Sequence, residues 1–317
     1  MSFDSLLGNE QLKKELSGSI RKGNISHCYL ICGPEGSGKH TLARLLAAAI
    51  HCTGQEKPCM ICQPCRKVME DTHPDVITVD DREHKTVTVR VVREARADIY
   101  VMPNESDRKI YLFPRAQDMG VEGQNALLKV LEEPPEYAVF ILLSDNPEKL
   151  LPTVRSRCRE LRMQPLDRNL LQRRLETDFP NAAPADIHGA IRRSGGYLGQ
   201  ARALLEEGSD LPPQTESFFR AFAGKDTLLL AQTLAPMEKW KRDALIPILE
   251  SWLAILEEAL ADRSGSAAVS QLARQTAASC TGRDIYRGIS CLRKATDYAR
   301  SNVSPGAVCG WLLWELW

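Results

Sequence analysis

The stretch Gly33-Pro34-Glu35-Gly36-Ser37-Gly38-Lys39-His40-Thr41 has the glycine and lysine spacing of a phosphate-binding loop. The apolar run 27–32 before it predicts a buried strand, and the run 42–50 after it, rich in Leu and Ala, predicts a helix. In this context backbone N–H groups curl around a phosphate, while the helix dipole and the lysine charge stabilise the anion. Residues 27–50 therefore predict a strand, a phosphate loop and a helix.

One position departs from the pattern of a loop that hydrolyses nucleotides. The residue after the lysine is normally Ser or Thr, whose hydroxyl binds magnesium, and here it is His40. Thr41 comes one residue later, so its side chain points about 100° away around the helix. The parts that hold an anion are kept, the magnesium site is incomplete, and binding of ATP or ADP stays an open question. The candidate phosphate contacts are Gly33, Gly36, Gly38, Lys39 and Thr41.

Size and composition are those of an ordinary soluble protein. The chain has 317 residues, enough for two or three domains, with 43% hydrophobic and 26% charged residues. Lys and Arg together number 41, as do Asp and Glu, so the net charge does not indicate a nucleic-acid or membrane surface. No apolar run approaches the roughly 20 residues that span a bilayer, and the N-terminus lacks the features of a signal peptide. We therefore expect a cytoplasmic protein without a membrane partner.

Four of the ten cysteines gather directly after the phosphate-loop helix, at Cys52, Cys59, Cys62 and Cys65. Two overlapping Cys-x-x-Cys turns present three thiolates, and Cys52 at the end of the helix can complete a tetrahedron. Four sulfurs suit a structural Zn²⁺ ion that has no open position for chemistry. A redox dithiol needs only two cysteines and is disfavoured. His51 remains an alternative to Cys52 as the fourth ligand.

Further strands are predicted at 75–80, 109–113, 138–143 and 159–163. Helical segments separate them, including 87–100 and 124–131, the second of which ends at Pro134-Pro135. The run 138–143 is apolar throughout, as expected for a strand covered on both faces. Strands that alternate with helices predict an α/β fold with a five-stranded parallel sheet and helices on both faces.

Beyond Pro165 the sequence predicts only helices. Three short ones, at 170–178, 185–194 and 199–207, precede the segment 208–213, whose Gly, Ser, Asp and Pro residues are typical of a linker. The remainder has apolar stripes at helical spacing, which predict a helical bundle. We therefore expect three domains, at 1–165, 166–208 and 209–317, with the cysteine cluster 52–65 inserted in the first.

The third strand in sequence ends without the acidic residues that a phosphate-loop ATPase needs. These acids bind magnesium and activate the attacking water. Here the strand 110–113 runs into Pro114 and Arg115, and the nearest carboxylate is Asp118, several residues further on. The sequence therefore predicts that the chain does not hydrolyse ATP.

Three segments together resemble bacterial clamp-loader subunits of DNA polymerase III, which belong to the AAA+ family. They are the strand 110–113, the run Gln124-Asn125-Ala126-Leu127-Leu128-Lys129-Val130-Leu131-Glu132-Glu133-Pro134-Pro135, and the run Leu151-Pro152-Thr153-Val154-Arg155-Ser156-Arg157-Cys158. The Ser-Arg-Cys of the last run is highly specific to clamp loaders, and a zinc cluster at this place also occurs in bacterial members. The similarity covers most of residues 1–208.

Within this family the chain is more similar to the delta prime type than to the ATP-hydrolysing gamma/tau type. The gamma/tau type has Asp-Glu where this chain has Pro114-Arg115, and a sensor arginine where it reads Gly196-Tyr197-Leu198-Gly199. The resemblance implies an AAA+ module with a helical lid, followed by an all-α collar. It also implies a non-catalytic stator in a hetero-pentamer with gamma/tau and delta subunits, which loads the sliding clamp onto primed DNA as part of the DNA polymerase III holoenzyme.

The resemblance further implies that Arg157 acts as an arginine finger on a nucleotide bound by a neighbouring subunit. Without the family, an internal salt bridge is the simpler interpretation of this arginine. Two other classes remain open: an active gamma/tau-type ATPase, which His40, Pro114 and Arg115 oppose, and a zinc-containing nucleic-acid-binding protein on a phosphate-loop fold, which the neutral net charge opposes.

Overall fold

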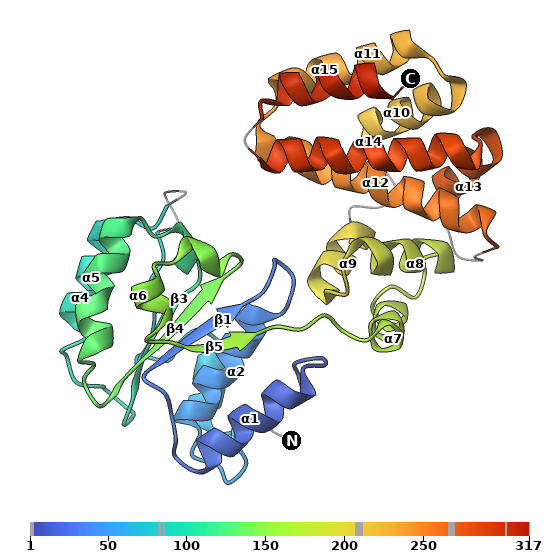
Figure 1. Cartoon of the computed structure of the whole chain (residues 1–317). Coiled ribbons are helices and arrows are strands. Elements are labelled where there is room, and N and C mark those ends of the chain that lie inside the picture. The colour runs from blue at the N-terminus through green and yellow to red at the C-terminus, as the bar shows by residue number, and fades with distance from the viewer. Residues whose placement is uncertain are drawn as a thin grey trace. The chain divides into compact units, whose positions relative to one another are not determined.

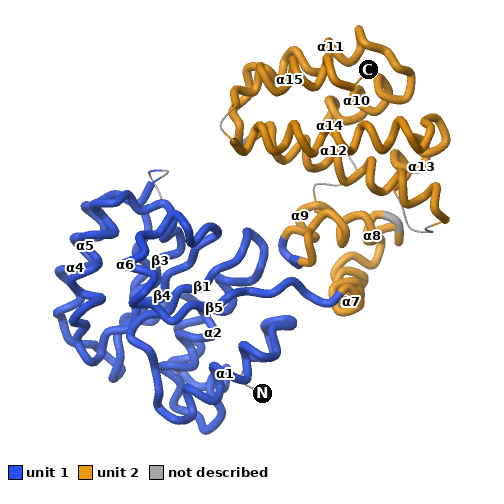
Figure 2. Tube along the Cα trace, in the orientation of Figure 1, with its two compact units in different colours: residues 1–167, 197–199 blue, residues 168–196, 200–317 orange. Residues whose placement is uncertain are grey.

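The computed structural model describes residues 3–81, 84, 86–206, 212–265, 270–301 and 303–316. The chain divides into two compact units, drawn in different colours in Figure 2: residues 1–167 with 197–199, and residues 168–196 with 200–317. Residues 208–211 of the predicted linker, and with them the domain boundary predicted at 208, lie outside the described residues. Among the helices that are described, none is long and apolar enough to cross a lipid bilayer.

The first unit is built on a parallel sheet of five strands, which confirms the predicted fold class (Figure 1). In sheet order the strands are β2 (Val76–Thr78), β3 (Lys109–Phe113), β4 (Ala138–Ser144), β1 (Cys28–Cys32) and β5 (Arg159–Arg162). Two of the three interior strands, β1 and β4, are buried along their whole length. Their registers place Cys32, the last residue of β1, beside Ser144, the last residue of β4.

Helices cover both faces of this sheet because alternate strand residues point to opposite sides. On one face Tyr29 and Ile31 pack against α1, α2 and α3, and on the other Cys28 and Leu30 pack in the core formed with α4, α5 and α6. The helices are α1 (Glu10–Arg21), α2 (Lys39–His51), α3 (Gln63–Met69), α4 (Val89–Asp98), α5 (Val121–Glu132) and α6 (Pro152–Arg155), with short 3₁₀ turns η1 (Ala116–Asp118) and η2 (Pro147–Lys149).

The strand predicted at 75–80 is shorter than expected: β2 comprises only Val76–Thr78, and an aspartate with a partner elsewhere lies near each end. The Asp75 carboxylate accepts hydrogen bonds from the backbone N–H groups of Asn104, Glu105 and Ser106, at 2.6 to 3.0 Å. Asp80 pairs with Arg115. Backbone hydrogen bonds to β3 nevertheless extend to both neighbours of β2, since the Asp75 carbonyl accepts from the Ile110 N–H and Val79 donates to the Leu112 carbonyl, each at 2.8 Å.

The second unit is entirely helical in its described residues. Its helices are α7 (Arg168–Asp178), α8 (Pro184–Arg193), α9 (Leu198–Glu206, of which the first two residues belong to the first unit), α10 (Pro213–Gly224), α11 (Thr227–Leu234), η3 (Ala235–Lys239), α12 (Arg242–Arg263), α13 (Gln271–Ser279), α14 (Gly282–Arg300) and α15 (Pro305–Glu315). Its core centres on Trp252, whose indole stacks on Phe218 at 4.0 Å between ring centroids and donates a hydrogen bond to the Thr215 hydroxyl. Gly288 lets α14 approach α12 closely, since a Cβ there would lie 2.7 Å from Leu256.

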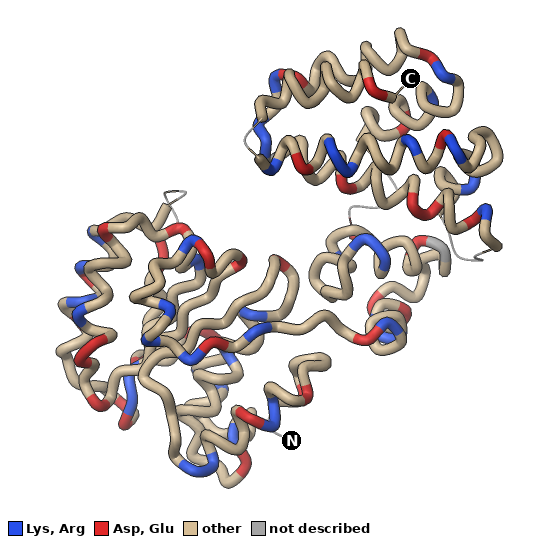
Figure 3. The backbone as a smooth tube through the Cα atoms, viewed as in Figure 1, with Lys and Arg blue, Asp and Glu red and all other residues tan. Residues whose placement is uncertain are grey.

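Charges of both signs are mixed along the helices of this unit, as Figure 3 shows for α12 and α14. Arg293 and Arg300 on α14 pair with Glu257 and Glu250 on α12, each at 2.7 Å. Exposed pairs of this kind contribute little to stability, about 0–1 kcal/mol each. They leave the surface of these two helices close to neutral, in line with the balanced composition.

Candidate functional site

The phosphate loop connects β1 to α2 at the carboxyl edge of the sheet. The Gly33 N–H bonds to the Ser144 carbonyl at the end of β4, at 3.1 Å. Gly36 and Gly38 have φ angles of 73° and 89°, a left-handed conformation that favours glycine, and Gly38 is the N-cap of α2. The backbone therefore forms the tight turn onto a helix N-terminus that an anion site requires.

A glycine far along the chain lies against this loop. The Gly199 N–H donates to the Gly36 carbonyl at 2.9 Å, and a Cβ on Gly199 would lie 2.5 Å from the Gly36 Cα. Only glycine tolerates so close an approach of two backbones. The backbone around Gly199 therefore covers this part of the loop.

Lys39 is buried and has a partner that the sequence did not reveal. Its Nζ lies 3.3 Å from the Pro34 carbonyl and forms an ion pair with Asp145, which directly follows β4. Because β4 is the sheet neighbour of β1, the residue after β4 lies beside the loop that follows β1. The sequence shows a carboxylate directly after an apolar strand. It predicts a partner for Lys39 only once the strand order is known.

The two residues after the lysine, His40 and Thr41, are both exposed. The position that normally supplies a magnesium-binding hydroxyl therefore carries an exposed imidazole. The end of β3 also lacks a magnesium ligand that the ATPase pattern requires. Arg115 there binds Asp80 through Nε and Nη2, at 2.9 and 2.7 Å to the same carboxylate oxygen. The backbone of the loop has the shape of an anion site, whereas neither His40 nor Arg115 supplies the hydroxyl or carboxylate that binds magnesium in an ATPase.

Arg157 follows α6 and lies at the surface. About a third of its side chain, 32%, is exposed, and it pairs with Glu132 at the end of α5, with 2.6 Å from Nη2 to Oε1. Nη1 also donates to the Thr153 carbonyl at 2.8 Å. The structure thus gives this arginine the internal salt bridge that was the simpler of its two interpretations. The Glu132 carboxylate is itself 48% exposed, so the pair is accessible to solvent.

The four cysteines of the cluster come together, with all four sulfur atoms within 4.8 Å of one another. Zinc–sulfur bonds of about 2.3 Å in a tetrahedron place the sulfurs about 3.8 Å apart, close to the observed arrangement. Cys52 caps the C-terminus of α2, and Cys62 and Cys65 begin α3. The group can therefore hold a metal ion, which would fasten α3 onto the end of α2 opposite the phosphate loop.

Backbone N–H groups point at these sulfurs and lower the pKa of Cys59, whereas burial outweighs them at Cys52 and leaves its pKa raised. Gly54 and Cys59 both donate to the Cys52 sulfur at 3.3 Å, and Cys62 donates to the Cys59 sulfur at 3.4 Å. Burial raises the pKa of the Cys62 thiol, but backbone hydrogen bonds from Cys65 and Thr53 outweigh it and bring the pKa to about 6. Hydrogen bonds of this kind orient metal ligands and tune their basicity.

His51 lies next to the cluster but takes no part in it. Its ring stacks on His73, with 4.3 Å between centroids and 15° between planes. Burial and the neighbouring His73 lower the pKa of His51 to about 4, so this imidazole is neutral. Within the described residues, the set that can hold a metal consists of the four cysteines and does not include His51.

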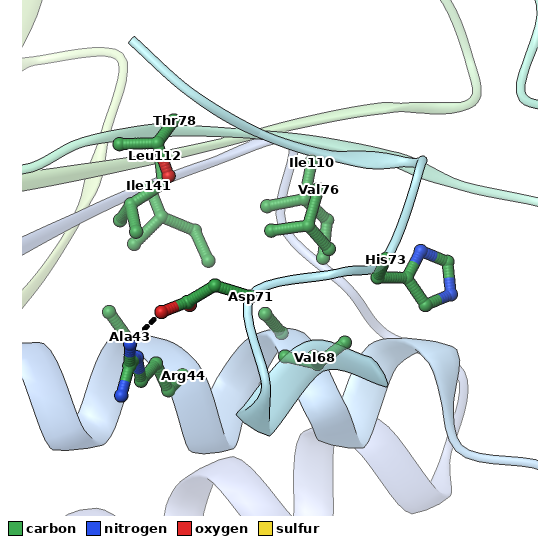
Figure 4. A pocket seen from close by; sticks show the side chains of 11 residues that line it. Ala43, Arg44, Val68, Asp71, His73, Val76, Thr78, Ile110, Leu112 and Ile141 are labelled. Atoms are coloured by element: carbon green, nitrogen blue, oxygen red, sulfur yellow. Dashed lines mark hydrogen bonds and ion pairs between the residues drawn. The ribbon is translucent and has the colours of Figure 1, made fainter. Parts of the chain in front are cut away.

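A small cavity lies between α2, the turn after α3 and the sheet (Figure 4). Its volume is about 30 Å³, and mainly apolar side chains line it, with the ion pair between Arg44 and Asp71 at one side. A space of this size holds about one water molecule. It is a packing defect under the sheet and has no room for a nucleotide.

Comparison with known proteins assigns the chain to a family. The family model described as "DNA polymerase III, delta subunit" matches residues 8–167, half of the chain. The gamma/tau subunit of DNA polymerase III from Mycobacterium tuberculosis is 33% identical over 214 residues, which are 65% of this chain and 37% of that protein. For the tau subunit from Escherichia coli the figures are 33% identity over 212 residues, 65% of this chain and 33% of that protein.

The chain thus spans little more than a third of the length of these curated relatives. Among solved structures, a DNA polymerase III gamma subunit-related protein from Thermotoga maritima aligns over 97% of this chain and 98% of its own, at 17% identity and a TM-score of 0.47. The family match extends from before α1 to beyond β5 and includes the phosphate loop and the cysteine cluster. The chain therefore belongs to the DNA polymerase III delta-subunit family of AAA+ clamp-loader subunits.

Proposed function

We propose that the chain is a stator of the delta prime type in a bacterial DNA polymerase III clamp loader. In this role it hydrolyses no ATP itself and joins gamma/tau-type and delta subunits in a hetero-pentamer. Residues 166–208 serve as the lid and residues 209–317 as the collar that holds the subunits together. The complex opens the sliding clamp and places it on primed DNA, and Arg157 completes the ATP site of a neighbouring subunit.

The observation that carries this proposal is the end of β3. The acids that bind magnesium and activate water in an ATPase are replaced by Pro114 and Arg115, and the Arg115 guanidinium is held by Asp80. Neither Pro114 nor Arg115 carries a carboxylate, so these positions supply neither a magnesium ligand nor a general base. His40, in the position of the magnesium-binding hydroxyl, supports the same conclusion.

The cysteine cluster has a structural part in the proposal. Zinc bound by Cys52, Cys59, Cys62 and Cys65 has a closed shell of four sulfurs and supplies cross-linking of the chain rather than catalysis. Because α2 carries the phosphate loop at its other end, the metal also fixes the helix on which that loop is built.

The names of the curated relatives favour a second candidate, an active gamma/tau-type ATPase. It requires Lys39 and an acid near Arg115 to act together on a bound nucleotide. Asp80 is a carboxylate beside Arg115, but its Oδ1 is engaged by that arginine. A direct assay of turnover separates the two candidates.

We expect the isolated chain to turn over no ATP above background, and Lys39→Ala to make no difference. The measurement is steady-state phosphate release with magnesium, with and without primed DNA. Native mass spectrometry of a mixture with gamma/tau-type and delta subunits should show this chain in the assembled complex. Steady turnover that Lys39→Ala abolishes would establish the ATPase candidate, and failure to enter the complex would exclude the stator.

A further inference from the structure

The charge of Lys39 is satisfied within the chain. The lysine is 5% exposed, and its Nζ contacts the Asp145 carboxylate and the Pro34 carbonyl. An ammonium group buried to this extent is costly unless it is paired and hydrogen-bonded. Asp145 therefore supplies Lys39 with the negative charge that a bound phosphate supplies to the lysine of a nucleotide-loaded phosphate loop.

Asp145 is held beside the loop by the backbone on which it sits. The residue before it, Ser144, pairs with Cys32 in the sheet and accepts the Gly33 N–H through its carbonyl. The Asp145 side chain is 44% exposed, so it is the solvent-facing partner of this ion pair, and Lys39 is the buried partner. A ligand that approaches Lys39 from solvent meets this carboxylate first.

Hydroxyl groups near the loop are left without partners. The Ser37 and Ser144 Oγ atoms are buried and have no hydrogen-bond partner among the described residues, and Ser144 is fully buried. Ser37 belongs to the loop itself. Buried hydroxyls normally have partners, so the loop and the neighbouring end of β4 each keep an unused donor.

We propose that Asp145 is an internal counter-ion, which holds Lys39 in place of a phosphate and gives this pocket a low affinity for nucleoside di- and triphosphates. The inference rests on the proposed function only in taking the loop as a remnant nucleotide pocket. Binding of a phosphate requires Lys39 to change partners and brings the phosphate charge close to the Asp145 carboxylate. Both effects oppose binding, and both disappear when the carboxylate is neutralised.

The test is calorimetric titration of the isolated chain and of Asp145→Asn with ADP and with inorganic pyrophosphate, with and without magnesium. We expect the variant to bind both ligands at least about tenfold more tightly, a change of about 1.4 kcal/mol. The matched control is Asp71→Asn, which also removes one negative charge. Asp71 pairs with Arg44, which lies on α2, the helix that begins with Lys39. This control should bind like the unaltered chain.

Thermal unfolding provides a second readout that does not depend on a binding isotherm. Asp145→Asn leaves Lys39 buried without its carboxylate, so pyrophosphate should raise the Tm of this variant more than that of the unaltered chain. Adding Lys39→Met should remove the gain in both assays. If Asp145→Asn does not fold, Asp145→Ser serves in its place.

Equal affinities of the unaltered chain and Asp145→Asn would overturn the inference, as would a gain that persists in the variant that also carries Lys39→Met. The titrations use the isolated chain, whereas the stator role is read from assembly and turnover. Failure of the stator proposal would therefore leave the effect of Asp145 on affinity measurable, and failure of the Asp145 proposal would leave assembly unchanged.

Discussion

In a clamp loader reassembled with Arg157→Ala in this chain, we expect ATP turnover at the neighbouring site to fall by about 10³–10⁵-fold. An arginine that reaches the transferring phosphoryl group stabilises charge that develops only in the transition state. Arg157 is available for this because its pair with Glu132 is solvent-accessible, and exposed pairs are worth only about 0–1 kcal/mol. A phosphate next door is a stronger partner than an exposed carboxylate.

The measurement is pre-steady-state phosphate release in the presence of clamp and primed DNA, where loss of one site removes one equivalent of the burst. Glu132→Gln is the decisive control, because it breaks the same salt bridge and keeps the arginine. We expect it to hydrolyse ATP at least as fast as the unaltered complex. Arg155 lies two residues before Arg157 and pairs with Glu148, so Arg155→Ala controls for damage to the local fold. If Glu132→Gln and Arg157→Ala lose the same activity, the arginine is only a structural partner.

Loss of the metal should have the second-largest effect. We expect one zinc per chain in protein prepared without a histidine tag, and background zinc in Cys62→Ser. The free energy of unfolding of the first unit should fall by about 4 kcal/mol or more, at the upper end for single substitutions. For a unit of this size that corresponds to roughly 8–16 °C in Tm. The cause is the loss of the cross-link between α2 and α3, since binding free energy at a structural site is folding free energy.

Zinc content by elemental analysis and Tm by calorimetry test this directly. Cys32→Ser is the control, because Cys32 is also buried in the first unit but lies at the end of β1, outside the cluster. It should keep its zinc. A folded, metal-free chain in which the cluster cysteines form disulfides would contradict the account.

Much of the first unit could be predicted because its signals are local. The strand at 109–113 is observed with the predicted bounds, and β4 is one residue longer than predicted. Both consist of apolar runs, and the glycine loop and the cysteine spacing are short motifs that carry their own geometry. The helix α3 was not predicted, since a seven-residue helix inside a cysteine cluster has too few positions for a periodic pattern.

The parts of the site that could not be predicted depend on contacts between distant segments. Asp145 becomes the partner of Lys39 only because β4 lies next to β1 in the sheet. Gly199 contacts Gly36 although the two are far apart in the sequence, and the residues around either glycine do not predict this contact. The same holds for Glu132, which was part of the motif that indicated the family but was not foreseen as the partner of Arg157.

The central claim is that this chain completes a neighbour's site and has no hydrolytic site of its own. The most direct test assembles the complex from this chain, unaltered, and ATPase subunits whose own phosphate-loop lysines are substituted, and measures clamp-stimulated ATP hydrolysis. The account predicts background turnover, because the pocket around Lys39 lacks both the magnesium-binding hydroxyl and the acids at the end of β3. Turnover above background that disappears when Lys39→Ala is introduced into this chain would contradict it.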